Sequence, residues 1–191
     1  MIDQALQFLI DTLFGIVTYA LLLRFVMQWL RAPFRNPLAQ AVVALTDWAV
    51  KPMRRVLPAF SGLDTSSLFL AWVAQFAWLV ALRLVASLAG FGVATAAMLA
   101  VLACIELLKA ALWLLVIAVF VQALLSWVSA DGPLAGVLNA LTFRFLSPIR
   151  RRLPLIGGTL DLSPLILIVI VQLVLMLPVR WLEGFVAALF R

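Results

Sequence analysis

Long apolar stretches separated by short basic segments dominate the pattern of this chain. Four stretches are apolar over about 20 residues each, enough for a helix to cross roughly 30 Å of hydrocarbon. They lie at residues 5–30, 67–88, 103–128 and 164–182. Residues 89–102 are ambiguous, because Gly90 and Gly92 indicate a break while the apolar run continues. This segment either lies at the outer surface or lengthens a neighbouring span. The pattern predicts an all-α membrane protein with four transmembrane helices.

Two shorter segments, residues 37–51 and 133–147, place apolar residues at helical spacing among polar ones. Each begins with a proline suited to the first helical turn and stops before another proline, Pro52 or Pro148. We therefore expect two amphipathic helices in the inner membrane interface, with their apolar faces toward the lipid. Packing of these helices against the transmembrane bundle gives the same periodicity and stays open as an alternative.

The whole pattern occurs twice. The segment KPMRRVLPAFSGLDTSS in the first half returns as SPIRRRLPLIGGTLDLSP in the second, and Pro148 lies 96 residues after Pro52. A period this long indicates a duplicated half-protein and not the unit of a solenoid. The expected units are a first repeat at residues 1–88, a connection at 89–102 and a second repeat at 103–191.

Basic residues gather in the two loops that follow the first and third spans, and cytoplasmic loops near spans are rich in Lys and Arg. The N-terminal segment before Arg24 holds neither residue type, and neither does the connection between Arg83 and Lys109. We therefore expect a multi-pass protein of the bacterial inner membrane, with both basic loops in the cytoplasm and both termini outside. Each repeat then enters the membrane in the same orientation, so the repeats are parallel.

The repeated motif combines an arginine pair, Leu-Pro, a glycine turn and an aspartate, Asp64 or Asp161. Thr65 or Ser66 in the first copy, and Ser163 in the second, are suited to cap the span that follows. A carboxylate near a helix N-terminus is favoured by the helix dipole and can pair with an arginine. The motif therefore either clamps the short helix to the next span or docks lipid or a partner protein. The clamp residues are Asp64, Asp161, Ser163, Pro52, Pro58, Pro148 and Pro154, and the docking residues are Arg54, Arg55, Arg150, Arg151 and Arg152.

Several ionisable residues fall inside the predicted spans, where charge is costly. Those near span ends are interpreted as anchors whose long side chains reach the interface: Arg24, Arg83 and Arg180. Asp11 and Lys109 occupy matching places in the two repeats with opposite charge and can neutralise each other, although Glu106, one turn before Lys109, is a simpler partner. Asp11, Glu106 and Lys109 therefore form either a neutral cluster or part of an ion pathway.

Composition argues against catalysis and against nucleic acid. The chain has no histidine and one cysteine, which excludes histidine-based metal sites and general bases. It has no phosphate-binding glycine loop and no nucleophile elbow. The net charge of +6 comes from basic residues beside the spans, so anionic lipid headgroups are the expected counter-charge. We expect no metal, no cofactor and no enzymatic activity.

These motifs resemble the YggT family, also called YlmG-like, of small bacterial and plastid membrane proteins. The resemblance rests on TDWAVKPMRRVLPAFSGLDTSS and TFRFLSPIRRRLPLIGGTLDLSP, with Arg24 and Trp29 before the first segment and Gln122 and Trp127 before the second. It covers nearly the whole chain as two tandem copies of the family unit. Gln122 stands where the first copy has Arg24, which implies that the two halves have diverged.

The resemblance implies a broad class of function and no common mechanism. Family members look like non-catalytic proteins linked to cell division, to osmotic tolerance and cation uptake, or, in plastids, to maturation of a b-type cytochrome. We therefore expect a membrane scaffold or assembly factor that engages anionic lipid and partner proteins and is able to self-associate. The alternative is an ion channel or transporter in osmotic tolerance or cation uptake.

Overall fold

The computed structural model describes residues 2–32, 36–58, 63–86, 93–128, 133–152 and 161–189. This part of the chain is helical, as the sequence predicts. The helices are α1 (Ile2–Trp29), α2 (Pro37–Met53), α3 (Thr65–Val85), α4 (Val93–Val128), α5 (Pro133–Arg152), α6 (Ser163–Val174) and α7 (Arg180–Leu189), with a π-helical turn, η1 (Leu175–Val179), between α6 and α7.

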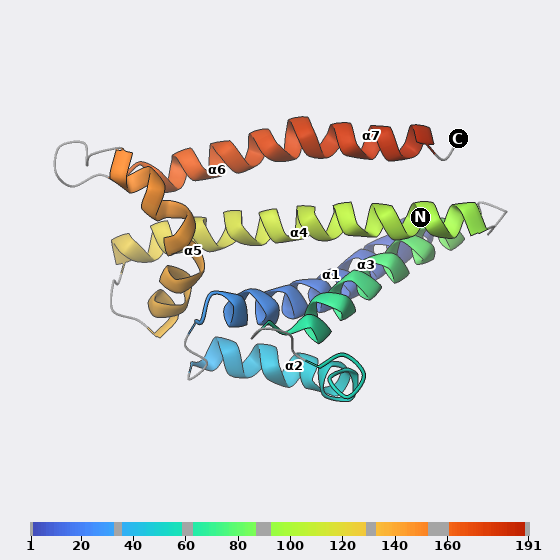
Figure 1. Cartoon of the computed structure of the whole chain (residues 1–191), viewed down its shortest axis with the longest axis horizontal. Helices are drawn as coiled ribbons and strands as arrows, with labels where there is room; N and C mark the ends of the chain where they lie inside the picture. The colour runs from blue at the N-terminus through green and yellow to red at the C-terminus, as the bar shows by residue number, and fades with distance from the viewer. Residues whose placement is uncertain are drawn as a thin grey trace.

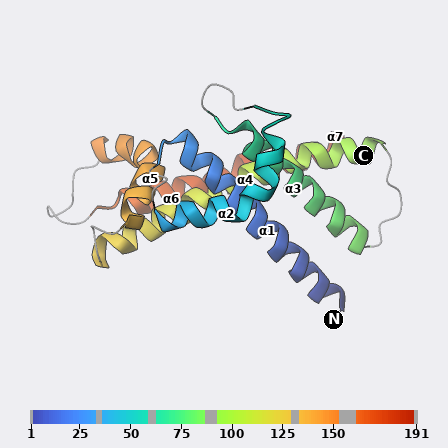
Figure 2. The same ribbon diagram turned by 90° about the horizontal axis from the view of Figure 1, so that it is seen from below.

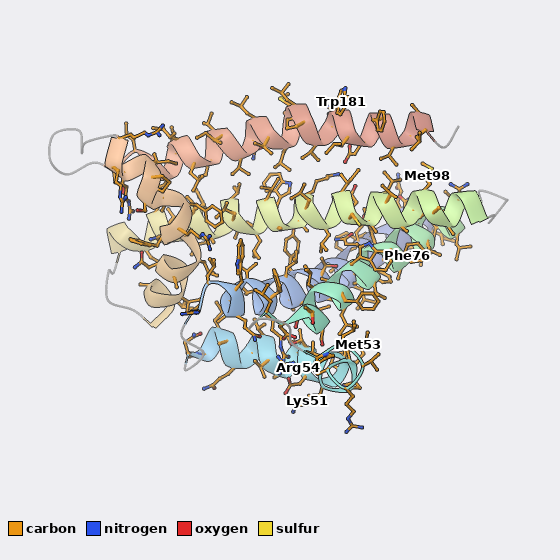
Figure 3. The ribbon with its side chains drawn as sticks, viewed as in Figure 1. Lys51, Met53, Arg54, Phe76, Met98 and Trp181 are labelled. Atoms are coloured by element: carbon orange, nitrogen blue, oxygen red, sulfur yellow. The ribbon has the colours of Figure 1, made fainter. Side chains whose placement is uncertain are left out.

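Four helical stretches are long and apolar enough to cross a membrane, and the prediction of four spans is confirmed. They are Gln4–Trp29, Thr65–Val85, Thr95–Leu125 and Ser163–Leu189. Large apolar side chains are exposed along these stretches, among them Leu13, Leu165 and Trp181. Figure 3 shows Trp181 on the side of α7 that faces away from α4. Such a surface suits surrounding lipid and would be costly in water.

The long helix α4 lies at the centre of the molecule (Figure 1). The α6–η1–α7 segment runs beside it, whereas α1 and α3 pack together and cross it obliquely (Figures 1 and 2). Helix α2 lies against α1 and α3, on the side away from α6, and α5 lies across the end of the molecule where α4 ends. Both termini lie toward the other end, where α4 begins.

Apolar packing is organised around α4, which supplies a residue to each of four buried clusters. These residues are Ala118, Ala110, Val119 and Ile105. The cluster that holds Ala118 also contains Met27 of α1 and Val137 of α5, so the two halves share a core. Arg144 of α5 lies over the ring of Trp29 at 5.4 Å from its centroid, a cation–π contact at the same junction.

The helix ends differ from the prediction at two prolines. Helices α2 and α5 continue through Pro52 and Pro148, whereas the sequence pattern predicted that each ends before its proline. A proline removes the hydrogen bond to the carbonyl four residues earlier. Those carbonyls belong to Trp48 and Arg144, two residues at the protein surface.

The ambiguous segment between the repeats is resolved in part, because residues 93–102 belong to α4. They therefore lengthen a neighbouring span. The fourth span continues beyond its predicted end at residue 182 to Leu189, through the π-helical turn that contains Pro178. A π-helical turn accommodates a residue that cannot donate the regular hydrogen bond.

Helix α1 ends in a Schellman-type turn. The Ala32 N–H donates to the carbonyl of Met27 at 2.8 Å, and the Arg31 N–H donates to that of Gln28 at 3.2 Å. Arg31 has a φ of 53°, a left-handed conformation that is usually held by glycine at this place. The turn leads toward α2, where the Asn36 side chain caps the helix.

Candidate functional site

A buried arginine joins the first three helices. Arg24 of α1 is 5% exposed. Its Nη1 donates to Thr46 Oγ1 at 2.7 Å and to Asp47 Oδ1 at 2.9 Å, both on α2. Its Nε lies 3.5 Å from Oδ2 of Asp64, just before α3. The interpretation of Arg24 as an interfacial anchor was therefore wrong, since its charge is neutralised inside the protein.

Asp64 is the most deeply buried carboxylate of this network, with no exposed side-chain surface. Arg54 Nη2 donates to Asp64 Oδ2 at 2.6 Å, and Ser67 Oγ donates to the same oxygen at 2.7 Å. Burial alone would raise the pKa of Asp64, but the hydrogen bonds from Arg54 and Ser67 outweigh it and lower that pKa below its ordinary value. Asp64 therefore stays ionised and joins the end of α2 to the start of α3.

The cap of α3 is Asp64 itself, and not Thr65 or Ser66 as predicted. Its side chain accepts a hydrogen bond from the Ser67 N–H at 3.4 Å. The two hydroxyls instead fasten the preceding loop, because Thr65 Oγ1 donates to the carbonyl of Pro58 at 2.9 Å. Ser66 Oγ donates to the carbonyl of Leu57 at 2.6 Å. The motif thus holds its own loop in place as well as the helix.

The second repeat keeps the pairing of arginine with aspartate in a more exposed form. Arg150 Nε and Nη2 both lie 2.9 Å from Asp161 Oδ2. Ser163, predicted as the cap of the fourth span, is instead the first residue of α6, and its N–H donates to Asp161 Oδ1 at 2.9 Å. Burial would raise the pKa of Asp161, but bonds from Ser163 and Arg150 lower it below its ordinary value. Pro154 lies outside the described residues.

The place of Arg24 in the second repeat is taken by Gln122, and the network there is neutral. Thr142 Oγ1 donates to Gln122 Oε1, and Gln122 Nε2 lies 3.5 Å from Asn139 Oδ1. Asp161 pairs with Arg150 and is 30% exposed, whereas its counterpart Asp64 is fully buried. The repeats therefore share a geometry and differ in how much charge they bury.

The motif divides its arginines into two groups. Arg54 and Arg150 pair with the aspartates. Arg55, Arg151 and Arg152 are exposed, and within the described part of the chain they make no ion pair. The arginines that sequence analysis grouped together thus differ in what they are free to contact.

A second charged cluster lies around the middle of α4. Lys109 Nζ is 2.8 Å from Glu106 Oε1 and 2.8 Å from Glu183 Oε1 of α7. Asp11 does not pair directly with Lys109, because its Oδ1 accepts a hydrogen bond from Trp78 Nε1 at 2.7 Å. Sequence analysis missed Glu183, since it lies one residue beyond the predicted end of the fourth span.

Two clefts border Lys109, and each combines a mostly apolar lining with a few polar side chains. A cleft of about 240 Å³ is lined by Asp11, Gln75 and Glu106, and a second of about 470 Å³ by Arg180 and Glu183. Lys109 lines both. Within the described residues, no three His, Cys, Asp or Glu side chains gather as a metal site would require.

Comparison with known proteins matches both halves of the chain to one family. The CCB3/YggT family model matches residues 3–85 and again residues 101–182. The chain belongs to the CCB3/YggT family. The resemblance inferred from the repeated motif, including the two tandem copies, is confirmed. No solved structure matches the chain.

Bacterial relatives of this CCB3/YggT protein match most of its length. The YggT protein of Escherichia coli (strain K12) is 38% identical over 172 residues, which cover 90% of this chain and 87% of that protein. A protein of Pseudomonas aeruginosa is 35% identical over 182 residues, 94% of this chain and 90% of that one. A protein of Haemophilus influenzae is 28% identical over 162 residues, 84% of each chain.

Differences between the two CCB3/YggT units mark the residues of the buried network. The first unit has Arg24 and Asp47, and the second has Gln122 and Phe143 at the matching places. The cation and the carboxylate are thus replaced together. Residues that change as a pair between related copies are candidates for spatial contact. Comparison of the two repeats therefore indicates a contact between α1 and α2.

Proposed function

We propose that this protein is a non-catalytic membrane scaffold whose basic cytoplasmic ends bind anionic lipid and partner proteins. The observation that carries the proposal is the division of the arginines. Arg54 and Arg150 are engaged by aspartates, whereas Arg55, Arg151 and Arg152 are exposed near the ends of α2 and α5. Free guanidinium groups next to a membrane attract anionic lipid by about 1 kcal/mol each.

The proposal places the protein in the bacterial inner membrane with parallel repeats and both termini outside. Both termini lie toward one end of the molecule, opposite α5, as four spans require (Figure 1). The basic residues after α2 and α5 favour the cytoplasm for the opposite side. In this arrangement α2 and α5 lie at the membrane interface, but their buried apolar residues, such as Ala39 and Val137, pack against the transmembrane bundle and not toward lipid as first expected. Their exposed aromatic residues, Trp48 and Phe143, suit the headgroup level.

The role of the free arginines in lipid binding is tested by measuring which lipid the purified protein retains in detergent. Native mass spectrometry with added phosphatidylglycerol or phosphatidylcholine compares the wild type with a triple variant, Arg55→Gln, Arg151→Gln and Arg152→Gln. We expect the triple variant to lose its preference for phosphatidylglycerol, and the matched triple lysine variant to keep it, because lysine preserves the charge. An unchanged preference in the glutamine variant contradicts the proposal, provided that its thermal unfolding matches that of the wild type.

Ion passage is a second candidate function, favoured by the two clefts that flank Lys109. Charged side chains within spans often mark ion paths. Under this alternative, purified protein in proteoliposomes conducts potassium, and the double variant Asp11→Asn, Lys109→Gln abolishes the flux. Absence of flux from folded wild-type protein, measured against empty liposomes, rejects this alternative and leaves the scaffold proposal standing.

A further inference from the structure

An apolar groove lies between α1, α2 and α3 of the first repeat. Its volume is about 250 Å³, and apart from Thr46 its lining residues are apolar. Ala49 of α2 and Ala74 and Ala77 of α3 line it with small side chains, and Trp48 lines it from α2. Trp48 is 72% exposed, so the groove opens to the surroundings beside this ring.

The matching place in the second repeat carries larger side chains. Phe145 stands where the first repeat has Ala49, and Val171 stands where it has Ala74. Phe145 packs against the buried cluster that contains Val171 and Leu167. The same helix arrangement thus tolerates side chains that fill this space. In the first repeat, the small side chains of the alanines leave this space open.

Cationic side chains lie beside the opening of the groove. Lys51 is one helical turn after Trp48 on α2, and its side chain is 73% exposed. Its Nζ lies 2.8 Å from Oδ2 of Asp47, and the ammonium keeps further N–H donors for a phosphate. Arg55 lies in the turn that follows α2 and is exposed without an ion pair among the described residues. Figure 3 shows Lys51 on the side of α2 that faces away from α4. An apolar slot beside two exposed cations matches a molecule with a hydrocarbon chain and an anionic head.

We propose that the groove binds one acyl chain of an anionic phospholipid whose phosphate is held by Lys51 and Arg55. The inference rests on the proposed function, since Arg55 belongs to both, and adds a defined site for a single lipid in the first repeat. Within a bilayer, lipid tails are as apolar as leucine, so van der Waals packing in the groove, and not exclusion from water, holds the chain. The two cations therefore select the headgroup, and the groove fixes where the chain lies.

The test fills the groove with the residue that the second repeat uses. In the Ala49→Phe variant all charges are kept, and the second repeat demonstrates that this helix pairing accepts phenylalanine. Ala41→Phe is the matched control, because Ala41 is exposed on the same helix and does not line the groove. Native mass spectrometry at limiting phosphatidylglycerol counts the lipid that stays bound to the folded protein.

We expect one tightly held phosphatidylglycerol on the wild type and on Ala41→Phe, and its loss from Ala49→Phe. The double variant Lys51→Gln, Arg55→Gln leaves the packing intact, and we expect it to bind phosphatidylglycerol about 30-fold more weakly. The affinity of the double variant for phosphatidylglycerol should equal its affinity for phosphatidylcholine.

Retention of this lipid by Ala49→Phe overturns the inference. The scaffold proposal survives that result if the triple arginine variant still loses its preference for phosphatidylglycerol. If Ala49→Phe and the triple arginine variant both behave as the wild type, both proposals fail. Loss of a dimer from Ala49→Phe without any change in bound lipid assigns the groove to a second copy of the chain and also overturns the inference.

Discussion

Arg24 and Gln122 occupy matching places in the two repeats, and each is hydrogen-bonded to the matching threonine, Thr46 or Thr142, on the short helix that follows. The repeats therefore preserve one connection between span and short helix while changing its charge. Replacing a buried ion pair by neutral groups is tolerated when both partners change. Phe143 in the place of Asp47 is the second half of that exchange.

The Arg24→Gln substitution is expected to destabilise the protein by about 2 kcal/mol, because Asp47 and Asp64 each lose a charged hydrogen-bond partner while keeping another cation, Lys51 or Arg54. We expect the glutamine amide to bond Thr46, as Gln122 bonds Thr142, so the loss of stability measures the contribution of the Arg24 charge. Unfolding in detergent micelles, followed by circular dichroism, measures it. A double-mutant cycle with Asp47→Asn should give a coupling energy well above zero. Additive losses would show that the 2.9 Å ion pair contributes little.

The pH dependence of stability should reveal Asp64. Its pKa is lowered in the folded protein, so its stabilising contribution is complete above the ordinary carboxyl pKa of about 4 and is lost as the pH falls through the lowered pKa. Asp64→Asn keeps a capping side chain and removes this charge. Unfolding midpoints measured from neutral to acidic pH should fall less steeply in Asp64→Asn than in the wild type, and identical slopes would contradict the assignment.

The turn after α1 offers a stabilising substitution. Arg31 holds a φ of 53°, which costs roughly 1 kcal/mol for a residue with a Cβ. Arg31→Gly removes this strain and should raise the free energy of unfolding by up to about 1 kcal/mol. Arg31→Ala is the matched control, because it removes the same charge and keeps the Cβ. Equal stability of the glycine and alanine variants would mean that the left-handed backbone is not the cause.

Lys109 should be more sensitive to neutral substitution than either of its partners. Glu106→Gln or Glu183→Gln leaves Lys109 with one carboxylate, whereas Lys109→Gln leaves two carboxylates without a cation inside the span. We expect losses of about 1 kcal/mol for each glutamate variant and roughly twice that for the lysine variant. Unfolding in micelles compares the three, and a larger loss for either glutamate variant would contradict this order.

The repeat and the spans could be read from the sequence because hydrophobicity and periodicity are local properties. The continuation of α2 through Pro52 could not be read from the sequence, since it depends on whether the carbonyl of Trp48 can lack its helical hydrogen bond at the surface of the folded protein. The partners of Arg24 come from α2 and from the loop before α3, and a single sequence does not state which distant residues meet. Lys109 was recognised, but Glu183 was not, because its relevance depends on how α7 continues past Pro178.

Helix α4 has 36 residues and α3 has 21, corresponding to lengths of about 54 Å and 32 Å. The shorter helix matches a hydrocarbon layer of roughly 30 Å, whereas the longer one exceeds it even at a common tilt of about 20°. Lipids beside α4 must therefore stretch, or its end must stand above the layer. Where the lipids stretch, the unequal spans set a gradient of bilayer thickness around the protein. Mismatch of this kind sorts membrane proteins among regions of different thickness, independent of any headgroup charge.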